Sequence, residues 1–153
     1  MESYLRRDLT KRLRRQRATA IVVSKASMNE SELKVHNRLL SLGLNPTGKI
    51  IVENKYGTYN EVDNSFEFGG KRYFVMVTES KSDYMEVLAG HAKQHAGQAF
   101  FIKRCYPDCD ILSIILSKKN DIGNSRGVKY LKENTILITS LDNLKDVISG
   151  LSN

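Results

Sequence analysis

The sequence predicts an α/β protein in which a mixed β-sheet is flanked by helices on both faces. The first observation is that strand-like and helical segments alternate in the second half of the 153 residues. The second is a hairpin signal, in which Gly69 and Gly70 separate two apolar runs. The third is that residues 98–104 and 111–117 each contain a short apolar run, which is typical of strands buried on both faces.

Residues 1–28 are predicted to form a basic arm in front of a single α/β domain, residues 29–153. Apolar side chains recur in the arm at helical spacing, which predicts a short amphipathic helix. The other face of that helix is basic and carries Arg6, Arg7, Lys11, Arg12, Arg14, Arg15 and Arg17. With a net charge of +7, this cluster favours a polyanionic partner, nucleic acid before an anionic membrane surface. A solvated helix face is the alternative interpretation.

The domain is predicted to begin with a helix whose start is marked by a capping box, Asn29 to Glu32. Strand-like runs follow at 49–54, 59–68 and 71–78. A second capping box, at 83–86, predicts a helix that continues to about Gly97. The remaining predicted elements are strands at 98–104, 111–117 and 135–140, a helix at 127–133, and a last helix at 141–151 capped by Ser140.

The composition indicates a soluble protein of the cytoplasm. Its apolar runs are all shorter than the roughly 20 residues that a membrane span requires. The basic N-terminus is not followed by the apolar segment of a secretory signal. Cys105 and Cys109 lack the companions of a zinc site, so we expect two reduced thiols rather than a disulfide.

Candidate functional residues flank the predicted hairpin. Asp63 lies in its first strand, and Glu79, Ser80 and Lys81 follow its second strand. This pattern resembles the PD-(D/E)XK nuclease superfamily, with archaeal Holliday-junction resolvases and small archaeal or viral nucleases nearest in style. The resemblance covers about residues 30–140. It implies a restriction-endonuclease-like fold and a DNA endonuclease that depends on Mg²⁺ or Mn²⁺ and often works as a homodimer.

The resemblance also assigns roles to individual side chains. Asp63 and Glu79 would hold the metal, and Lys81 would be the catalytic lysine. Glu32 matches an extra carboxylate that some relatives carry, and Gln94 is placed like a glutamine that other branches use in catalysis. These residue types suit the chemistry, because carboxylates bind hard cations and a lysine stabilises charge that develops on a phosphate.

The geometry of the hairpin leaves the activity of this site open. A two-residue turn pairs Phe68 with Lys71 and sets Asp63 opposite Met76, so that Glu79 and Lys81 face the other way. Met76 and Thr78 would then occupy the family's Glu and Lys positions, leaving a nuclease fold that binds without cutting. A bulge near Gly70 would shift the parity and bring the site together. Glu61 and Glu67, on the face of Asp63, are candidate replacement ligands, and Lys93 on the following helix is a candidate for a missing strand lysine.

Two further features admit a functional and a structural interpretation. His91 and His95 have the spacing of two zinc ligands on one helix face, but the pattern around them favours packed histidines. Lys55 and Tyr56 lie in a predicted loop, where they would contact nucleic acid by phosphate pairing and stacking, or simply pack in a turn. The residues do not discriminate DNA from RNA. A protein-interaction module whose arm binds an acidic partner remains a third functional class.

Overall fold

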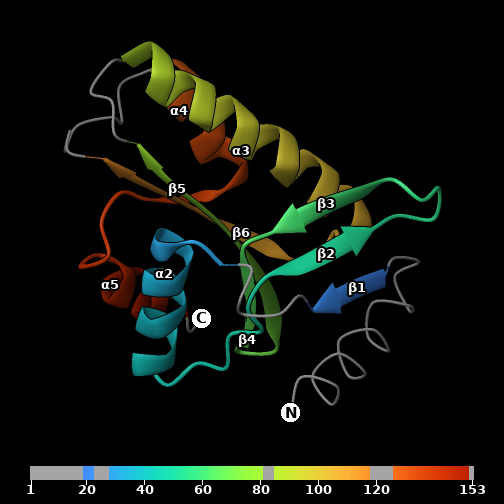
Figure 1. Ribbon diagram of the computed structural model, residues 1–153, viewed down its shortest axis with the longest axis horizontal. Helices are drawn as coiled ribbons and strands as arrows, with labels where there is room; N and C mark the ends of the chain where they lie inside the picture. The colour runs from blue at the N-terminus through green and yellow to red at the C-terminus, as the bar shows by residue number, and fades with distance from the viewer. Residues whose placement is uncertain (1–18, 23–27, 81–84, 118–125, 152–153) are drawn as a thin grey trace.

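The computed structural model describes residues 19–22, 28–80, 85–117 and 126–151 (Figure 1). These residues form a mixed α/β protein with four helices and two sheets, which confirms the predicted fold class. The elements in chain order are β1 (Thr19–Val22), α2 (Glu30–Ser41), β2 (Ile50–Glu53), β3 (Tyr59–Val62), β4 (Asn64–Phe68), β5 (Lys71–Ser80), α3 (Met85–Cys105), β6 (Asp110–Ser117), α4 (Arg126–Asn134), β7 (Ile136–Ile138) and α5 (Leu144–Gly150).

The smaller sheet is antiparallel and has the order β1-β2-β3. The larger sheet has the order β4-β5-β6-β7, with an antiparallel pair at one edge and parallel pairs elsewhere. β1 belongs to the stretch that the sequence assigns to the basic arm, and it pairs with β2. The predicted amphipathic helix of the arm and its seven basic side chains lie outside the described residues.

Helices cover both faces of the larger sheet (Figure 1). Side chains alternate along β5, so Val75 and Val77 pack with α2 and α5 while Phe74 and Met76 pack with α3. A further cluster joins α3 and α4 to β6 on the α3 side of the sheet. α2 and α3 therefore lie on opposite faces, and this decides which polar residues can meet.

The β4–β5 hairpin has the two-residue turn that the sequence predicts. Gly69 and Gly70 adopt φ angles of 60° and 80°, which are accessible to glycine at little cost. Phe68 pairs with Lys71, and the ladder continues without a bulge to the Asn64–Val75 pair. The clean register is thus confirmed, and the alternative with a bulge near Gly70 is wrong.

The strand predicted at 59–68 is two strands in two different sheets. β3 ends at Val62 and pairs with β2, whereas β4 begins at Asn64 and pairs with β5. Asp63 stands between them as a bend. Neither glycine nor proline marks this corner in the sequence, so residues 59–68 are compatible with one continuous strand.

The strand predicted at 98–104 is wrong, because α3 continues to Cys105. A short apolar run is ambiguous between a strand and a buried helix segment. Here Ala99 and Ile102 face the core at helical spacing, while Phe100 is exposed. Gly97 lies inside α3 and does not interrupt the helix.

The C-terminal elements agree with the predictions except in their bounds. The helix predicted at 127–133 is α4, and the strand predicted at 135–140 is the shorter β7. α5 begins at Leu144 with Asn143 at its N-cap, so Ser140 is not the cap. The Ser140 hydroxyl instead accepts the Asn143 N–H at 3.3 Å. The capping box predicted at 83–86 falls largely outside the described residues.

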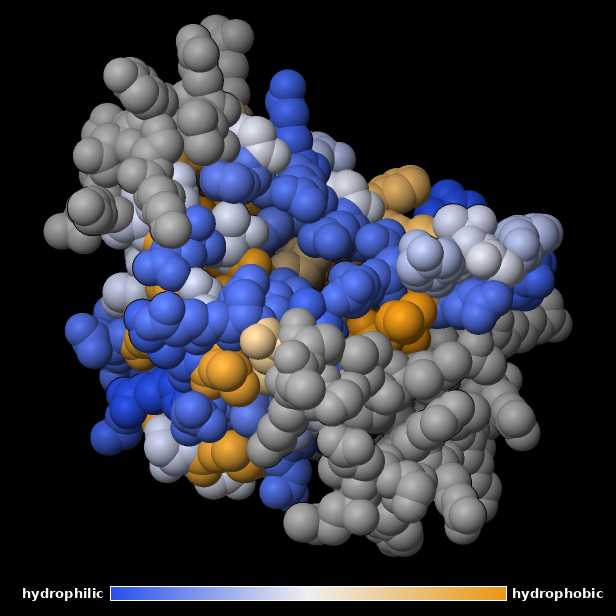
Figure 2. All heavy atoms as spheres, viewed as in Figure 1, coloured by the Kyte–Doolittle hydropathy of each residue, from blue (hydrophilic) through white to orange (hydrophobic). Residues whose placement is uncertain are grey.

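Cys105 and Cys109 are both buried free thiols, as predicted. Burial raises the pKa of both, that of Cys109 to about 12, so neither is a reactive thiolate at neutral pH. In the described part of the chain, every helix is too short or too polar to cross a membrane. Among the described residues on the face in Figure 2, hydrophilic side chains predominate, and apolar ones lie in small separate patches.

Candidate active site

Glu32 lies in the first turn of α2, where the predicted capping box is present. Asn29 Oδ1 accepts the Glu32 N–H at 2.9 Å, and Glu32 Oε1 accepts the Asn29 N–H at 2.9 Å. These reciprocal bonds fix the side chain at the helix start, where the helix dipole favours an anion. The residue is buried, so the capping box delivers a carboxylate to the interior of the protein.

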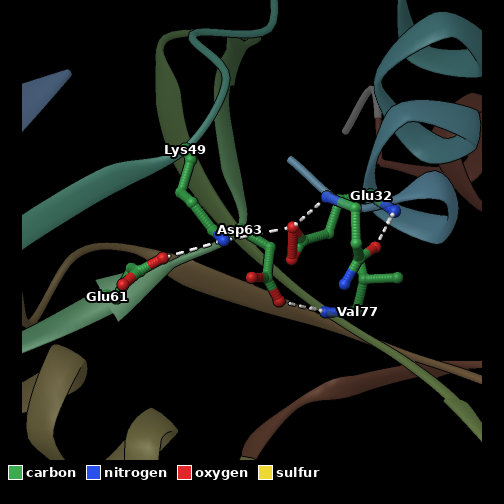
Figure 3. A network of polar contacts seen from close by, with 6 residues as sticks. Glu32, Lys49, Glu61, Asp63 and Val77 are labelled. Carbon is green, nitrogen blue, oxygen red and sulfur yellow. Dashed lines mark hydrogen bonds and ion pairs between the residues drawn. The ribbon is translucent and has the colours of Figure 1, made fainter. Parts of the chain in front are cut away.

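Asp63 occupies the corner where the chain passes from one sheet to the other. Its Oδ2 accepts the Val77 N–H at 2.7 Å, just beyond the last residue pair of the β4–β5 ladder. Its carboxyl group also contacts that of Glu32 (Figure 3). The corner therefore brings together two acidic side chains from elements 31 residues apart in the sequence.

Lys49 joins this pair from the residue that precedes β2. Its Nζ lies 3.1 Å from Glu32 Oε1 and 2.8 Å from Glu61 Oε1 (Figure 3). The side chain is largely buried, whereas Glu61 is half exposed. The positive charge of Lys49 is therefore shared between the carboxylates of Glu32 and Glu61.

Asn64 holds the segment that carries Lys49. Its Oδ1 accepts the Gly48 N–H at 3.0 Å, and its Nδ2 lies 2.9 Å from His36 Nδ1 on α2. Gly48 has a φ of 85°, and a Cβ there would lie 2.9 Å from Met28 Cε. A buried amide therefore ties β4, α2 and the approach to β2 together around the site.

The two carboxyl groups titrate as a coupled pair. Burial raises the pKa of Asp63 to about 7, and the neighbouring Glu32 acts in the same direction. Burial opposes ionisation of Glu32 as well, but the Asn29 N–H, Asp63 and Lys49 outweigh it and lower the pKa of Glu32. The pKa of Lys49 is raised, since its two carboxylate partners outweigh burial. The pair therefore retains a proton near neutral pH, and a bound cation would replace that proton.

The donor set suits one class of metal. Among the described residues, no group of three or more His, Cys, Asp and Glu side chains is placed to hold an ion. Zinc takes three or four such ligands, and the described residues do not provide that number here. Mg²⁺ fits, because it keeps several waters and is commonly held by one or two carboxylates together with substrate phosphates.

Glu79 is at the end of β5, on the same side of the sheet as Val77 and α2. It is exposed, and its Oε2 accepts a hydrogen bond from the Ser31 hydroxyl beside Glu32. Strand alternation predicts that Asp63 and Glu79 face opposite ways, but the bend takes Asp63 out of that alternation. Lys81 lies outside the described residues.

The other predicted site residues lie elsewhere. Gln94 and Lys93 are exposed on α3, on the face of the sheet opposite α2. Glu67 forms an ion pair with Arg72 at 3.7 Å. Lys55 and Tyr56 are exposed in the loop between β2 and β3.

Met76 and Thr78, which a continuous strand would place on the face of Asp63, are not part of the site. Met76 is in the core against α3, and the Thr78 hydroxyl lies 2.8 Å from His95 Nε2. The other nitrogen of His95 lies 2.5 Å from Ser113 Oγ. Both ring nitrogens of this buried histidine are thus taken by hydroxyls, as expected for a packed histidine rather than a zinc ligand.

Lys49 is the site residue that sequence reasoning missed. The only local signal is a lysine between Gly48 and the apolar strand that starts at Ile50, and such a lysine is common at the exposed end of a strand. Its contact with Glu32 depends on where the first turn of α2, which packs against β5, lies relative to the residue before β2. No pattern within either segment contains that information.

Comparisons with known proteins give little guidance. No protein-family profile matches the chain. No curated protein matches it either. Among solved structures, the chain is similar to protein VC1899 from Vibrio cholerae, at 14% identity and a TM-score of 0.44. The similarity covers 99% of this chain and 50% of that one, so this chain spans about half the length of that protein. A likeness of this size carries no argument about function.

Proposed function

We propose that the chain is a divalent-metal-dependent endonuclease that hydrolyses DNA phosphodiester bonds. The observation that supports this proposal most is the contact between the carboxyl groups of Glu32 and Asp63, with Lys49 beside them. The resemblance of Asp63 and the segment after the hairpin to PD-(D/E)XK nucleases points to the same chemistry. A buried acidic pair next to a lysine is also the kind of perturbed titratable cluster that is common at catalytic sites.

Each residue of the site has a distinct part in this proposal. Glu32 and Asp63 provide the oxygen ligands for Mg²⁺ or Mn²⁺. The metal, when bound, polarises the scissile phosphate and lowers the pKa of a coordinated water. Lys49 supplies positive charge that can pair with a phosphate oxygen once its contact with Glu61 is exchanged for one with substrate. The resemblance implies a metal-ligand role for Glu79 as well, but its carboxylate accepts a hydrogen bond from Ser31 and does not form a three-ligand group with Glu32 and Asp63. Lys81 remains the catalytic lysine that the resemblance implies.

A cleavage assay tests the proposal. Supercoiled plasmid and a branched junction are incubated with Mg²⁺ or Mn²⁺, with wild type and with Asp63→Asn and Glu32→Gln. Lys49→Met and Lys81→Met decide which lysine acts in the reaction. Glu67→Gln, which removes a surface ion pair outside the site, is the matched control. We expect at least a hundredfold loss in both carboxylate variants, and wild-type activity in the control.

Metal binding provides a readout that does not depend on catalysis. Mn²⁺ should raise the melting temperature of the wild type, because a ligand that binds only the folded state stabilises it. Asp63→Asn should abolish that shift, and Glu67→Gln should retain it. Equal shifts in all three proteins would show that Mn²⁺ binds somewhere other than at this pair.

The second candidate function is nucleic-acid binding without cleavage. The small donor set of the site favours it, because the described residues place no third metal-ligating side chain with Glu32 and Asp63. Salt-sensitive DNA binding by a wild-type protein that cuts neither substrate would support this candidate and exclude the first. The arginine-rich arm would then be the main contact. Weak binding that salt does not affect would instead favour a protein partner.

Two further proposals follow from the nuclease interpretation. Cutting both strands of a duplex calls for two centres, so we propose a homodimer, which sedimentation would detect. DNA hydrolysis inside a cell also agrees with a cytoplasmic location, where Cys105 and Cys109 would stay reduced. Titration of free thiols in unfolded protein that was purified without reductant measures whether Cys105 and Cys109 are reduced.

A further inference from the structure

Two hollows lie on the outer face of α3 and share one aromatic side chain. The first has a volume of about 390 Å³ and lies between the β2–β3 loop and the C-terminal half of α3, with Lys55, Tyr56, Phe100 and Arg104 in its lining. The second, of about 410 Å³, is lined in part by Lys93, Gly97, Phe100 and Tyr130. Figure 1 shows β2 and β3 beside this part of α3. We refer to the two together as the α3 groove.

The groove follows one stripe of the helix. Lys93, Gly97, Phe100 and Arg104 recur at intervals of three or four residues, which places them on a single face. From Lys93 to Arg104 the helix rises roughly 16 Å. Gly97 opens the middle of the stripe, where a Cβ would meet no atom within 4 Å. This length accommodates a few nucleotides of an unpaired strand.

Aromatic rings are exposed along the groove from three separate elements. Tyr56 is 79% exposed, Phe100 is 62% exposed, and Tyr130 of α4 is 53% exposed. Large rings in water are unfavourable for the isolated protein, and three of them around one groove favour a ligand with flat apolar faces. Nucleobases have such faces whatever their sequence.

The charges in the groove are of one sign. Lys55 Nζ lies 5.0 Å from the centre of the Tyr56 ring, and Arg104 lies 5.5 Å from the centre of the Phe100 ring. Lys93 adds a third positive charge at the other end. Neither lining contains an Asp or Glu among the described residues. Positive charges beside exposed aromatic rings suit a nucleic acid whose bases are unpaired, because the charges can contact phosphates while the rings stack on the bases.

We infer that the α3 groove binds single-stranded DNA, with bases stacked on Tyr56, Phe100 and Tyr130. Duplex DNA does not fit this pattern, because its base faces are already stacked on each other. The inference goes beyond the proposed cleavage site and rests on it only in taking DNA as the polymer. β3 connects the two, since it runs from Tyr59 beside the loop to Val62 next to Asp63, a span of roughly 10 Å.

Fluorescence tests the inference directly, because the chain contains no tryptophan. Phe100→Trp places a single indole in the groove, and a 12-nucleotide oligo(dT) should quench it by stacking. Tyr59→Trp is the matched control, since Tyr59 is 65% exposed and lines neither hollow. Unchanged indole emission from the Phe100→Trp variant at saturating oligo(dT), or equal quenching in both variants, would overturn the inference.

Anisotropy measurements in EDTA separate stacking from general phosphate contacts. We expect Phe100→Ala and Gly97→Glu each to weaken oligo(dT) binding at least tenfold, the first by removing a stacking face and the second by adding an anion. Phe100→Ala should leave binding of an abasic 12-mer unchanged. An equal loss for the abasic strand or for duplex DNA would overturn the role of stacking. Tighter binding of single-stranded RNA would overturn DNA as the occupant.

These measurements do not depend on the proposed cleavage chemistry. They are made without metal and in an Asp63→Asn background, so an inactive protein still reports on the groove. A wild-type protein that cuts neither substrate, together with intact quenching, would refute the nuclease alone. Intact cleavage without quenching would refute the groove alone.

Discussion

We expect the free energy of unfolding to fall measurably in mild acid because of His95. The imidazole is 2% exposed and bridges a hydroxyl on β5, from Thr78, and one on β6, from Ser113. Burial lowers the pKa of His95 to about 4 from the ordinary 6.5, and the charge of His91 one turn earlier acts in the same direction. The folded protein therefore keeps this ring neutral at neutral pH, with one nitrogen donating and the other accepting.

The sign and size of the effect follow from these two values. The unfolded chain protonates His95 below about pH 6.5, whereas the folded chain does so only below about pH 4. The contribution of His95 to stability is thus fully present above pH 6.5 and is lost as the pH falls toward 4. Between pH 7 and pH 5 the loss amounts to about 2 kcal/mol.

Urea unfolding at pH 7 and pH 5 measures the loss. His95→Gln is the informative variant, because glutamine keeps one donor and one acceptor but does not titrate. The wild type should lose about 2 kcal/mol more than the variant over this range. His91→Gln, on the preceding turn, is the control and should retain most of the wild-type dependence. Equal losses in wild type and His95→Gln would refute the assignment and attribute the pH dependence to other groups.

Three other substitutions test the packing and the site. Asp63→Asn should abolish cleavage. At pH 8 without metal it should also raise the free energy of unfolding by about 1 to 2 kcal/mol, because the amide still accepts the backbone N–H but carries no charge that repels Glu32. Asn64→Leu should lower that free energy by about 2 to 3 kcal/mol, since it leaves a buried N–H and a histidine nitrogen without this partner. Phe66→Ala should lower it by about 3 to 5 kcal/mol by opening a cavity in the α2 face of the core. Urea titration measures all three.

The fold class could be predicted because the local signals agree with the final packing. The Gly69-Gly70 turn, the apolar run of β6 and the capping box of α2 each determine their own element without reference to distant residues. The segment at 98–104 fails for the opposite reason. Its apolar run is compatible with strand and helix, and only packing of Ala99 and Ile102 against β5 decides between them.

The candidate site could be predicted only in part. Glu32 and Asp63 follow from the resemblance, but their direct contact and the presence of Lys49 depend on three elements meeting at one corner. Alternation along a single strand at 59–68 predicts that Asp63 and Glu79 diverge. This prediction holds only if the strand is continuous, but the chain passes from one sheet to the other at Asp63 itself.

The electrostatics of the corner argue for a functional role of Asp63 beyond the fold. Its structural task is to accept the Val77 N–H, and Asn or Ser would do this without opposing Glu32. A carboxylate in this place has its pKa raised to about 7, which means that ionising it costs stability. Lys49 offsets this only in part, because its charge is shared with Glu61. A buried acid that destabilises the folded state, where a neutral residue would serve, is what we expect of a group that binds a cation.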